Sequence, residues 1–254
     1  MVNYLRNAKG FSFWDPKTNS FESKFIKKIK LHISNFDLLN LEELDKIFPE
    51  SRLYVFLSKH SSKSRIPALT CHFPGNFSEN AYGGNYAELA VACPFLQKQY
   101  IREVTKIRSL IPEYQITIEA THHGPTSLNK PVIFIEIGST ALEWKDEKAA
   151  TIVCDCLLRA MDKGLGPCAK VGIGLGGTHY PVKLNKLLVE SEYGLAAVAA
   201  KHNLRSIDEY MLRQMVIKSA ERVKYAIVDL KGLGKEKHKV LQLLEKTELE
   251  ILKI

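Results

Sequence analysis

The sequence predicts an α/β fold, and three observations support this class. From about residue 52, short apolar stretches of strand length alternate with amphipathic stretches of helix length. Most of the predicted strands run into loops that contain glycine. The chain has 254 residues, of which 45% are hydrophobic and 25% are charged, and this is enough for one large core. We therefore expect a single domain over residues 1–254.

The first 50 residues carry the weakest pattern of the chain. Residues 29–34 are predicted as a strand and residues 41–47 as a short helix. Stronger apolar stretches follow, and each is bounded by polar or glycine-containing segments. These stretches predict strands at residues 53–58, 68–72, 114–121, 132–137, 169–175 and 225–230.

Residues 85–110 have helical spacing, but Pro94 interrupts the pattern and predicts two helices. The second of these helices should turn four apolar side chains inward, namely Leu96, Tyr100, Val104 and Ile107. Residues 235–246, rich in lysine and leucine, predict a C-terminal helix.

Two capping boxes predict where other helices begin. Thr140 and Glu143 form the first, and Gly164 is the expected stop of that helix. Ser206 and Glu209 form the second, at the start of a helix that should extend to about residue 220. The apolar stripe of the first helix consists of Ala149, Ile152, Val153, Cys156, Leu157 and Ala160.

Composition restricts the class of protein. No stretch approaches the roughly 18 apolar residues of a membrane span, and no signal peptide is evident, so we expect a cytoplasmic protein that does not enter a membrane. Five scattered cysteines make a disulfide framework improbable. The net charge of +8 favours a polyanionic partner such as RNA, although lysines spread over helix surfaces give the same total.

Polar residues gather where the predicted strands end. In an open α/β sheet, ligands bind beyond the carboxyl ends of the strands. Histidine supplies proton transfer at neutral pH and is a common zinc ligand, so several histidines at such positions suit hydrolysis. Five of the eight histidines lie at strand exits, namely His60, His72, His122, His123 and His179.

Two glutamates strengthen this expectation. Glu136 lies in a strand apolar enough to be buried on both faces, and Glu119 is similarly placed in the strand before it. A buried carboxylate is costly unless it binds a cation or strong donors, and pairing with a lysine or arginine is the alternative. The stretch THHGPTS at residues 121–127 could equally be a polar turn that ends a strand. Since adjacent residues of an extended chain point to opposite sides, we expect only one of His122 and His123 to face a substrate.

A glycine-rich run at residues 172–177 matches the GxGxxG pattern of dinucleotide sites. The segment that follows is Thr-His-Tyr-Pro and not an immediate helix, so the phosphate-binding helix N-terminus is missing. The sequence also contains no GxxxxGK[ST] loop, HExxH, CxxC pair or GxSxG elbow. We therefore expect no nucleotide cofactor.

Three quoted segments, SKHSSKSRIPALTCHFPGN, EATHHGPTSLNKPVIFIEIGS and GLGGTHY, together resemble the archaeal and plant type of D-aminoacyl-tRNA deacylase. The resemblance covers roughly residues 52–230. It implies a three-layer α/β/α sandwich with a mixed sheet, phosphorylase/hydrolase-like and related to peptidyl-tRNA hydrolase. It also implies hydrolysis of the ester between a D-amino acid and the tRNA 3′ end, with one or two zinc ions per subunit and the acceptor end of D-aminoacyl-tRNA as partner. We expect a monomer.

The residue pattern and the resemblance together suggest roles for individual side chains. An aminoacyl ester requires an activated water, a stabilised oxyanion and a side-chain pocket. We expect metal ligation by His72, His122, His179 and Glu136, catalysis by His122, His123, Glu136 and Thr126, and substrate contacts from Lys59, His60, Lys63, Asn76, Ser139, Gly176 and Gly177.

Two departures from the family pattern leave alternatives open. Residues 1–50 diverge, and Ala196-Ala197 stand where the resemblance leads us to expect a Gly-His pair. The alternatives are a zinc-dependent exopeptidase or nucleoside-processing enzyme of the same fold group, and a catalytically inactive tRNA-binding relative.

Overall fold

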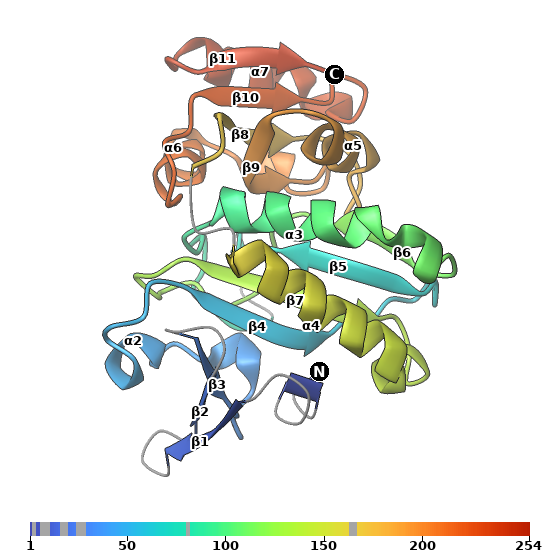
Figure 1. The fold of residues 1–254 in the computed structure, drawn as a ribbon. Coiled ribbons are helices and arrows are strands. Elements are labelled where there is room, and N and C mark those ends of the chain that lie inside the picture. The colour runs from blue at the N-terminus through green and yellow to red at the C-terminus, as the bar shows by residue number, and fades with distance from the viewer. Residues whose placement is uncertain (2–3, 6–10, 16–19, 24–28, 80–81, 163–166) are drawn as a thin grey trace.

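The computed structural model describes residues 1, 4–5, 11–15, 20–23, 29–79, 82–162 and 167–254. Two four-stranded sheets form the centre of the molecule (Figure 1). The first has the order β4-β7-β5-β6, with β5 antiparallel to β7 and the other pairs parallel. Its strands are β4 (Tyr54–Lys59), β5 (Ala68–His72), β6 (Gln115–Ile118) and β7 (Val132–Gly138).

The second sheet is parallel throughout, in the order β11-β10-β8-β9. Its strands are β8 (Lys170–Leu175), β9 (Tyr193–Ala199), β10 (Tyr225–Val228) and β11 (Glu250–Lys253). A separate antiparallel sheet near the N-terminus contains β1 (Phe11–Asp15), β2 (Ser20–Ser23) and β3 (Lys30–His32). The mixed and parallel sheets confirm the predicted α/β class.

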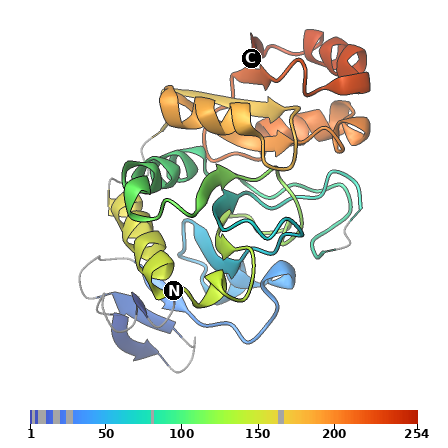
Figure 2. The ribbon, with the colours of Figure 1, turned by 90° about the vertical axis from the view of Figure 1, so that its right-hand side faces the viewer.

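Helices cover both faces of the sheets. They are α2 (Leu44–Ile47), α3 (Pro94–Lys106), α4 (Glu147–Asp162), α5 (Val182–Glu190), α6 (Glu209–Ile217) and α7 (Lys237–Glu245). Figure 2 shows α3, α4 and α5 on one side of the sheets and α6 and α7 on the other. The second sheet explains this division, because β9 and β10 lie on opposite sides of β8 and right-handed crossovers then place α5 and α6 on opposite faces.

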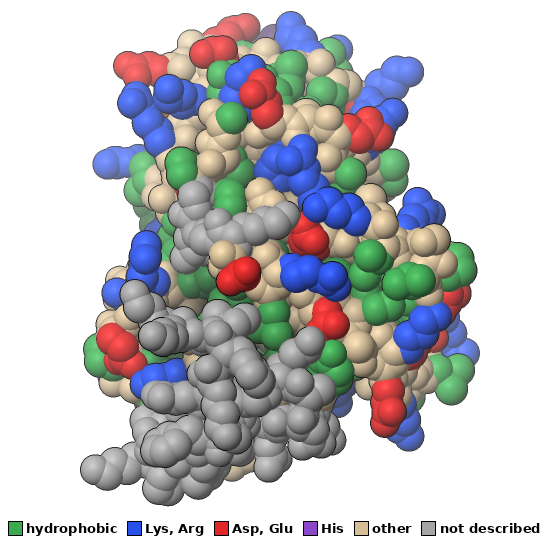
Figure 3. Space-filling model, in the orientation of Figure 1, with side chains coloured by type: hydrophobic (Ala, Val, Ile, Leu, Met, Phe, Trp, Pro, Cys, Tyr) green, Lys and Arg blue, Asp and Glu red, His purple; other side chains and the backbone are tan. Residues whose placement is uncertain are grey.

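Short 3-10 helices complete the described secondary structure. They are η1 (Leu38–Asn40), η2 (Arg108–Leu110), η3 (Glu143–Lys145), η4 (Leu204–Ser206) and η5 (Gly234–Glu236). In the part of the chain that is described, no helix is long and apolar enough to cross a membrane. On the face shown in Figure 3, lysine and arginine side chains are interspersed with aspartate and glutamate.

Residues 119–121, which we call the seam, join the two sheets. Ala120 N–H donates to the carbonyl of His179 (2.8 Å), and Thr121 N–H donates to the carbonyl of Val198 (2.9 Å). In return, Val198 N–H donates to the Thr121 hydroxyl (3.0 Å). The predicted strand 114–121 is therefore too long, because β6 ends at Ile118 and the backbones of Ala120 and Thr121 bond to segments of the second sheet and its loop.

The observed helix boundaries differ from the predictions at Pro94 and at both predicted capping boxes. Residues before Pro94 are not helical but form isolated bridges, so Pro94 is the first residue of a single helix, where its missing N–H is not needed. Glu143 accepts hydrogen bonds from the Thr140 backbone and hydroxyl as predicted, but these bonds lie at the start of η3 and not at the start of α4. Asp146 caps α4 by accepting from Ala149 N–H (3.0 Å).

The second predicted capping box is also displaced. Asp208, and not Ser206, caps α6, by accepting from Met211 N–H (2.8 Å), and the helix ends at Ile217. The apolar stripe predicted for α4 is buried throughout, as expected. The expected stop of that helix, Gly164, lies outside the described residues. The sequence pattern did not reveal α5, β9 or β11.

Candidate active site

Histidine and glutamate side chains from both sheets meet beside the seam. Their positions differ along the chain: one ends β5, one lies within β7, three follow β6, one follows β4 and one lies in the loop between β8 and α5. We call them the histidine–glutamate cluster, and its members are His60, His72, Glu119, His122, His123, Glu136 and His179.

Glu119 is the centre of this cluster. Its side chain is almost fully buried, yet both carboxylate oxygens face imidazole nitrogens. Oε2 accepts a hydrogen bond from His179 Nε2 (2.8 Å) and lies 3.8 Å from His122 Nε2. Oε1 lies 3.2 Å from His60 Nδ1 and 3.7 Å from His72 Nδ1. Burial alone would raise the pKa of Glu119, but the contacts with His179, His60 and His72 outweigh it and hold the pKa well below its usual range.

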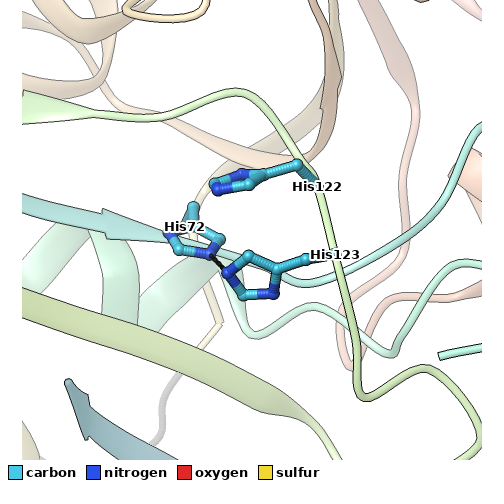
Figure 4. Close-up of side chains that lie close together, drawn as sticks. All are labelled: His72, His122 and His123. Atoms are coloured by element: carbon cyan, nitrogen blue, oxygen red, sulfur yellow. Dashed lines mark hydrogen bonds between the residues drawn. The ribbon is translucent and has the colours of Figure 1, made fainter. Parts of the chain in front are cut away.

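Three imidazoles, those of His72, His122 and His123, point toward one another (Figure 4). His72 Nε2 lies 3.1 Å from His123 Nε2, and the His72 ring stacks on the His122 ring at a centroid distance of 4.2 Å. His122 Nδ1 lies 2.8 Å from the carbonyl of Ala120, and His123 Nδ1 lies 2.7 Å from the carbonyl of Gly124. A carbonyl only accepts, so Nδ1 carries the hydrogen in both rings and Nε2 keeps its lone pair.

Both His122 and His123 therefore reach the same cluster, which corrects the expectation that only one would face it. The expectation assumed an extended backbone, in which neighbouring side chains alternate. His123 instead has a φ of +48°, in the left-handed region, so the alternation fails. Gly75 N–H donates to the carbonyl of His123 (2.7 Å) and anchors this conformation.

His122 and His123 are neutral at neutral pH. Burial, together with the electrostatic effect of the neighbouring His72 imidazole, lowers the pKa of His122 well below its usual range. The same two causes lower the pKa of His123 to about 3. Neutral rings are what a metal ligand or a hydrogen-bond acceptor for water requires.

The pKa of His60 is shifted in the opposite direction from those of His122 and His123. It is buried, and burial disfavours its charged form, but the nearby carboxylates of Glu119 and Glu136 outweigh burial and raise the pKa of His60 to about 9. His60 Nδ1 lies 3.5 Å from Glu136, and its Nε2 is 2.8 Å from the Tyr180 hydroxyl. A protonated His60 therefore donates to a carboxylate on one side and to Tyr180 on the other.

The cluster fits a metal ion. Three groups place their ligand atoms within 4.8 Å of one another. Within the described chain, His72 Nδ1 is a fully buried polar atom with no hydrogen-bond partner, which is costly unless another group is bound. The three groups are His72–His122–His123, Glu119–His122–His179 and His60–Glu119–Glu136.

Thr126 and Asn76, two of the residues predicted from sequence, hold a loop. The Thr126 hydroxyl donates to Glu88 (2.7 Å) and accepts from Asn85 N–H (2.8 Å). The Asn76 amide donates to the carbonyls of Gly83 (2.9 Å) and Asn85 (3.0 Å). Thr126 thus binds the loop around residues 82–88 to the segment that carries His122 and His123, and Asn76 binds the same loop to the segment after β5.

The remaining predicted residues lie around the cluster. The Ser139 hydroxyl donates to the carbonyl of Ile66 (2.7 Å). Lys59 lies over the ring of Trp144, whose N–H donates to the carbonyl of His60 (2.8 Å), and Lys63 is exposed. Gly176 N–H donates to the carbonyl of Ala199 (2.9 Å), so it is not free to bind an oxyanion.

The sequence reasoning left Tyr180 out of the site and gave Glu119 no role there. Tyr180 follows His179 directly in the quoted GGTHY turn, and Glu119 was noted as a buried carboxylate, so both signals were present. The sequence did not show that the carboxylate of Glu119 contacts four histidines. Ala196 and Ala197 are buried in β9, so the cluster is built without side chains from those positions.

Comparisons with known proteins agree on one family. The family model of D-aminoacyl-tRNA deacylase matches residues 47–252. A D-aminoacyl-tRNA deacylase of Cenarchaeum symbiosum is 40% identical over 199 residues, 78% of this chain and 76% of the relative. One of Methanococcus vannielii is 35% identical over 241 residues, 88% and 92% of the two chains. The crystal structure of a conserved protein of unknown function aligns with a TM-score of 0.81 and 29% identity, covering 93% of this chain and 87% of the other.

The raised pKa of His60 predicts a pH-dependent stability in metal-free, chelator-treated protein. Because its folded pKa of about 9 lies above the ordinary 6.5, the stabilisation is complete below pH 6.5 and is lost as the pH rises through 9. Between pH 6.5 and 9, the unfolding free energy of the wild type should fall by about 2–3 kcal/mol more than that of His60→Gln, measured by urea titration at each pH. His238→Gln, at an exposed position of α7, is the control. An unchanged pH profile in His60→Gln contradicts the assignment.

Proposed function

The chain belongs to the D-aminoacyl-tRNA deacylase family, and we propose that it hydrolyses the ester that joins a D-amino acid to the 3′ end of tRNA. The reaction releases free tRNA and a free D-amino acid, and so removes wrongly charged tRNA before translation. The observation that supports this most directly is the buried carboxylate of Glu119 among four imidazoles, all within the region matched by the family model.

We propose zinc as the metal, held by His72, His122 and His123. Two nitrogens bound to one tetrahedral zinc ion at about 2.0–2.1 Å lie about 3.3 Å apart. The 3.1 Å between His72 Nε2 and His123 Nε2 is close to that spacing. The carbonyls that hold Nδ1 of His122 and His123 are the outer contacts that zinc-binding imidazoles commonly have. Zinc, when bound, supplies a Lewis acid that makes water a better nucleophile at neutral pH.

One ion per chain fits the donors better than two. The first two candidate groups share His122, whose Nδ1 is already bonded to the carbonyl of Ala120. Only its Nε2 remains, so one of the two groups can be complete at a time. The third group contains His60, which is protonated at neutral pH and then offers no lone pair at either nitrogen.

His179 and Glu119 form a pair suited to general-base catalysis. Glu119 accepts from His179 Nε2, which fixes the tautomer and leaves Nδ1 as the basic nitrogen. His179 is about one-third exposed, so that nitrogen can meet a substrate. In the proposed reaction, the water oxygen bonds to the ester carbonyl carbon and its proton passes to His179.

In the proposed reaction, His60 and Tyr180 act on the carbonyl oxygen and the leaving ribose oxygen. The Tyr180 hydroxyl accepts from protonated His60 and can donate its own hydrogen to the carbonyl oxygen or the leaving ribose oxygen. The bond from the carbonyl carbon to the ribose oxygen then breaks, and that oxygen takes the proton that His179 received from the water. Glu136 keeps His60 in its charged form.

Substitutions in the cluster should separate zinc binding from proton transfer. His122→Ala removes a proposed ligand and should abolish both zinc binding and D-aminoacyl-tRNA deacylation. His179→Gln should keep the zinc but lower kcat by about 10²–10⁴, because an amide cannot take the proton. His238→Gln should match the wild type. Full deacylation by His122→Ala rules out the proposed site.

Zinc content is itself a test. Purified protein should contain one zinc per chain by metal analysis, and removal by a chelator should stop deacylation until zinc is restored. Circular dichroism checks that the chelated protein stays folded. Full activity in protein shown to be free of metal contradicts the zinc assignment and leaves the proposed substrate to be tested separately with D- and L-aminoacyl-tRNA.

A further inference from the structure

The second sheet presents one edge beside the histidine–glutamate cluster. Its four strands are parallel, so the loops that follow β8, β9 and β10 meet at the same edge. The strand order reverses at β8, and ligands of open parallel sheets bind at such a reversal, beyond the carboxyl ends of the strands. The loop after β8 carries His179 into the cluster. This edge therefore borders the place where the ester must lie.

The loops at this edge are basic. Residues 200–206 follow β9 and contain a histidine and two cationic side chains but no acidic residue. Residues 229–236 follow β10 and contain two lysines, with Asp229 and Glu236 as acidic residues. Asp229 is paired with Lys183 at 2.8 Å. We call the exposed cationic side chains of these loops the basic edge, and they are Lys201, Arg205, Lys231 and Lys235.

The side chains of the basic edge carry uncompensated charge. Among the described residues, none of the four forms an ion pair with a carboxylate. Elsewhere on the surface, lysines such as Lys46, Lys170 and Lys246 have carboxylate partners within 2.9 Å. Unpaired cations on one edge attract a polyanion, since binding releases the counterions condensed on its phosphates.

The two loops are fixed relative to each other. Gly234 has a φ of +58°, and a side chain there would collide with Lys201, so the Lys201 side chain lies across that turn. Lys239, in the helix α7 that follows the second loop, donates to the carbonyl of Arg205 in the first loop (2.8 Å). The two loops thus present their charges from a preformed surface.

The basic edge is continuous with the cluster. Lys201 N–H donates to the carbonyl of Gly177 (2.9 Å), two residues before His179. His202, the residue after Lys201, is close enough to both His179 and Arg205 to interact with them electrostatically. A chain of phosphates that passes over Lys201 and Arg205 would therefore lead to His179.

We propose that the basic edge binds the sugar–phosphate backbone of the acceptor arm of tRNA, and so directs the 3′ end into the cluster. This inference rests on the proposed function, because it assumes that the reacting ester is at a tRNA end. The contacts are with phosphates and read no base sequence. They suit an enzyme that must accept many different tRNAs.

The test compares a variant of the basic edge with a matched control on the same sheet. Lys201→Ala/Arg205→Ala removes one lysine and one arginine from the carboxyl edge. Arg222→Ala/Lys224→Ala removes the same two types of residue just before β10, at the opposite edge, where both are also exposed. KM and kcat are measured with D-aminoacyl-tRNA and with a D-aminoacyl ester of adenosine, which has the ester but no acceptor arm, across a range of salt concentrations.

The proposal predicts a specific pattern. Lys201→Ala/Arg205→Ala should raise KM for D-aminoacyl-tRNA about tenfold and reduce the slope of log KM against log salt by about one to two, with kcat unchanged. The adenosine ester should be hydrolysed as by the wild type, and Arg222→Ala/Lys224→Ala should resemble the wild type on both substrates. An unchanged KM and salt slope overturn the proposal, and so does an equal loss on the adenosine ester.

Failure of the proposed function would look different. Wild-type protein would then not hydrolyse D-aminoacyl-tRNA at all. In that case, binding of uncharged tRNA, measured by fluorescence anisotropy, still tests the surface: tighter binding by wild type than by Lys201→Ala/Arg205→Ala supports it, and equal binding overturns it.

Discussion

The buried carboxylate of Glu119 is the interaction on which the rest of the site depends. Removing a carboxylate from water costs several kcal/mol unless donors surround it. Here His60, His72, His122 and His179, from both sheets, face its two oxygens. The next two residues carry the hydrogen bonds that join the sheets. The contacts that join the sheets and the contacts that build the site therefore come from adjacent residues.

Around this carboxylate, the histidines divide into two environments. His122 and His123 are buried beside His72 and stay neutral, which suits a metal. His60 lies between two carboxylates and stays charged, which suits donation through Tyr180. The same residue type thus takes opposite protonation states within one cluster because its neighbours differ. The basic edge extends from the side of this cluster that His179 occupies.

Local sequence patterns revealed the fold class, most strands and the histidines at strand ends, because alternation and capping are encoded over a few residues. They did not reveal the helix start at Asp208 or the single helix after Pro94, where tertiary contacts select among several local signals. They also missed the common orientation of His122 and His123, which requires a left-handed residue. The role of Glu119 depends on distant segments that only the folded chain brings together.

The most direct test of this account is the kcat of D-aminoacyl-tRNA hydrolysis by Glu119→Gln, measured at neutral pH with zinc supplied. The amide keeps the size of the side chain but loses the charge that orients His179 and stabilises protonated His60. We expect kcat to fall by at least about a hundredfold in a protein that remains folded. A folded Glu119→Gln protein with the wild-type kcat would contradict the central role of this carboxylate.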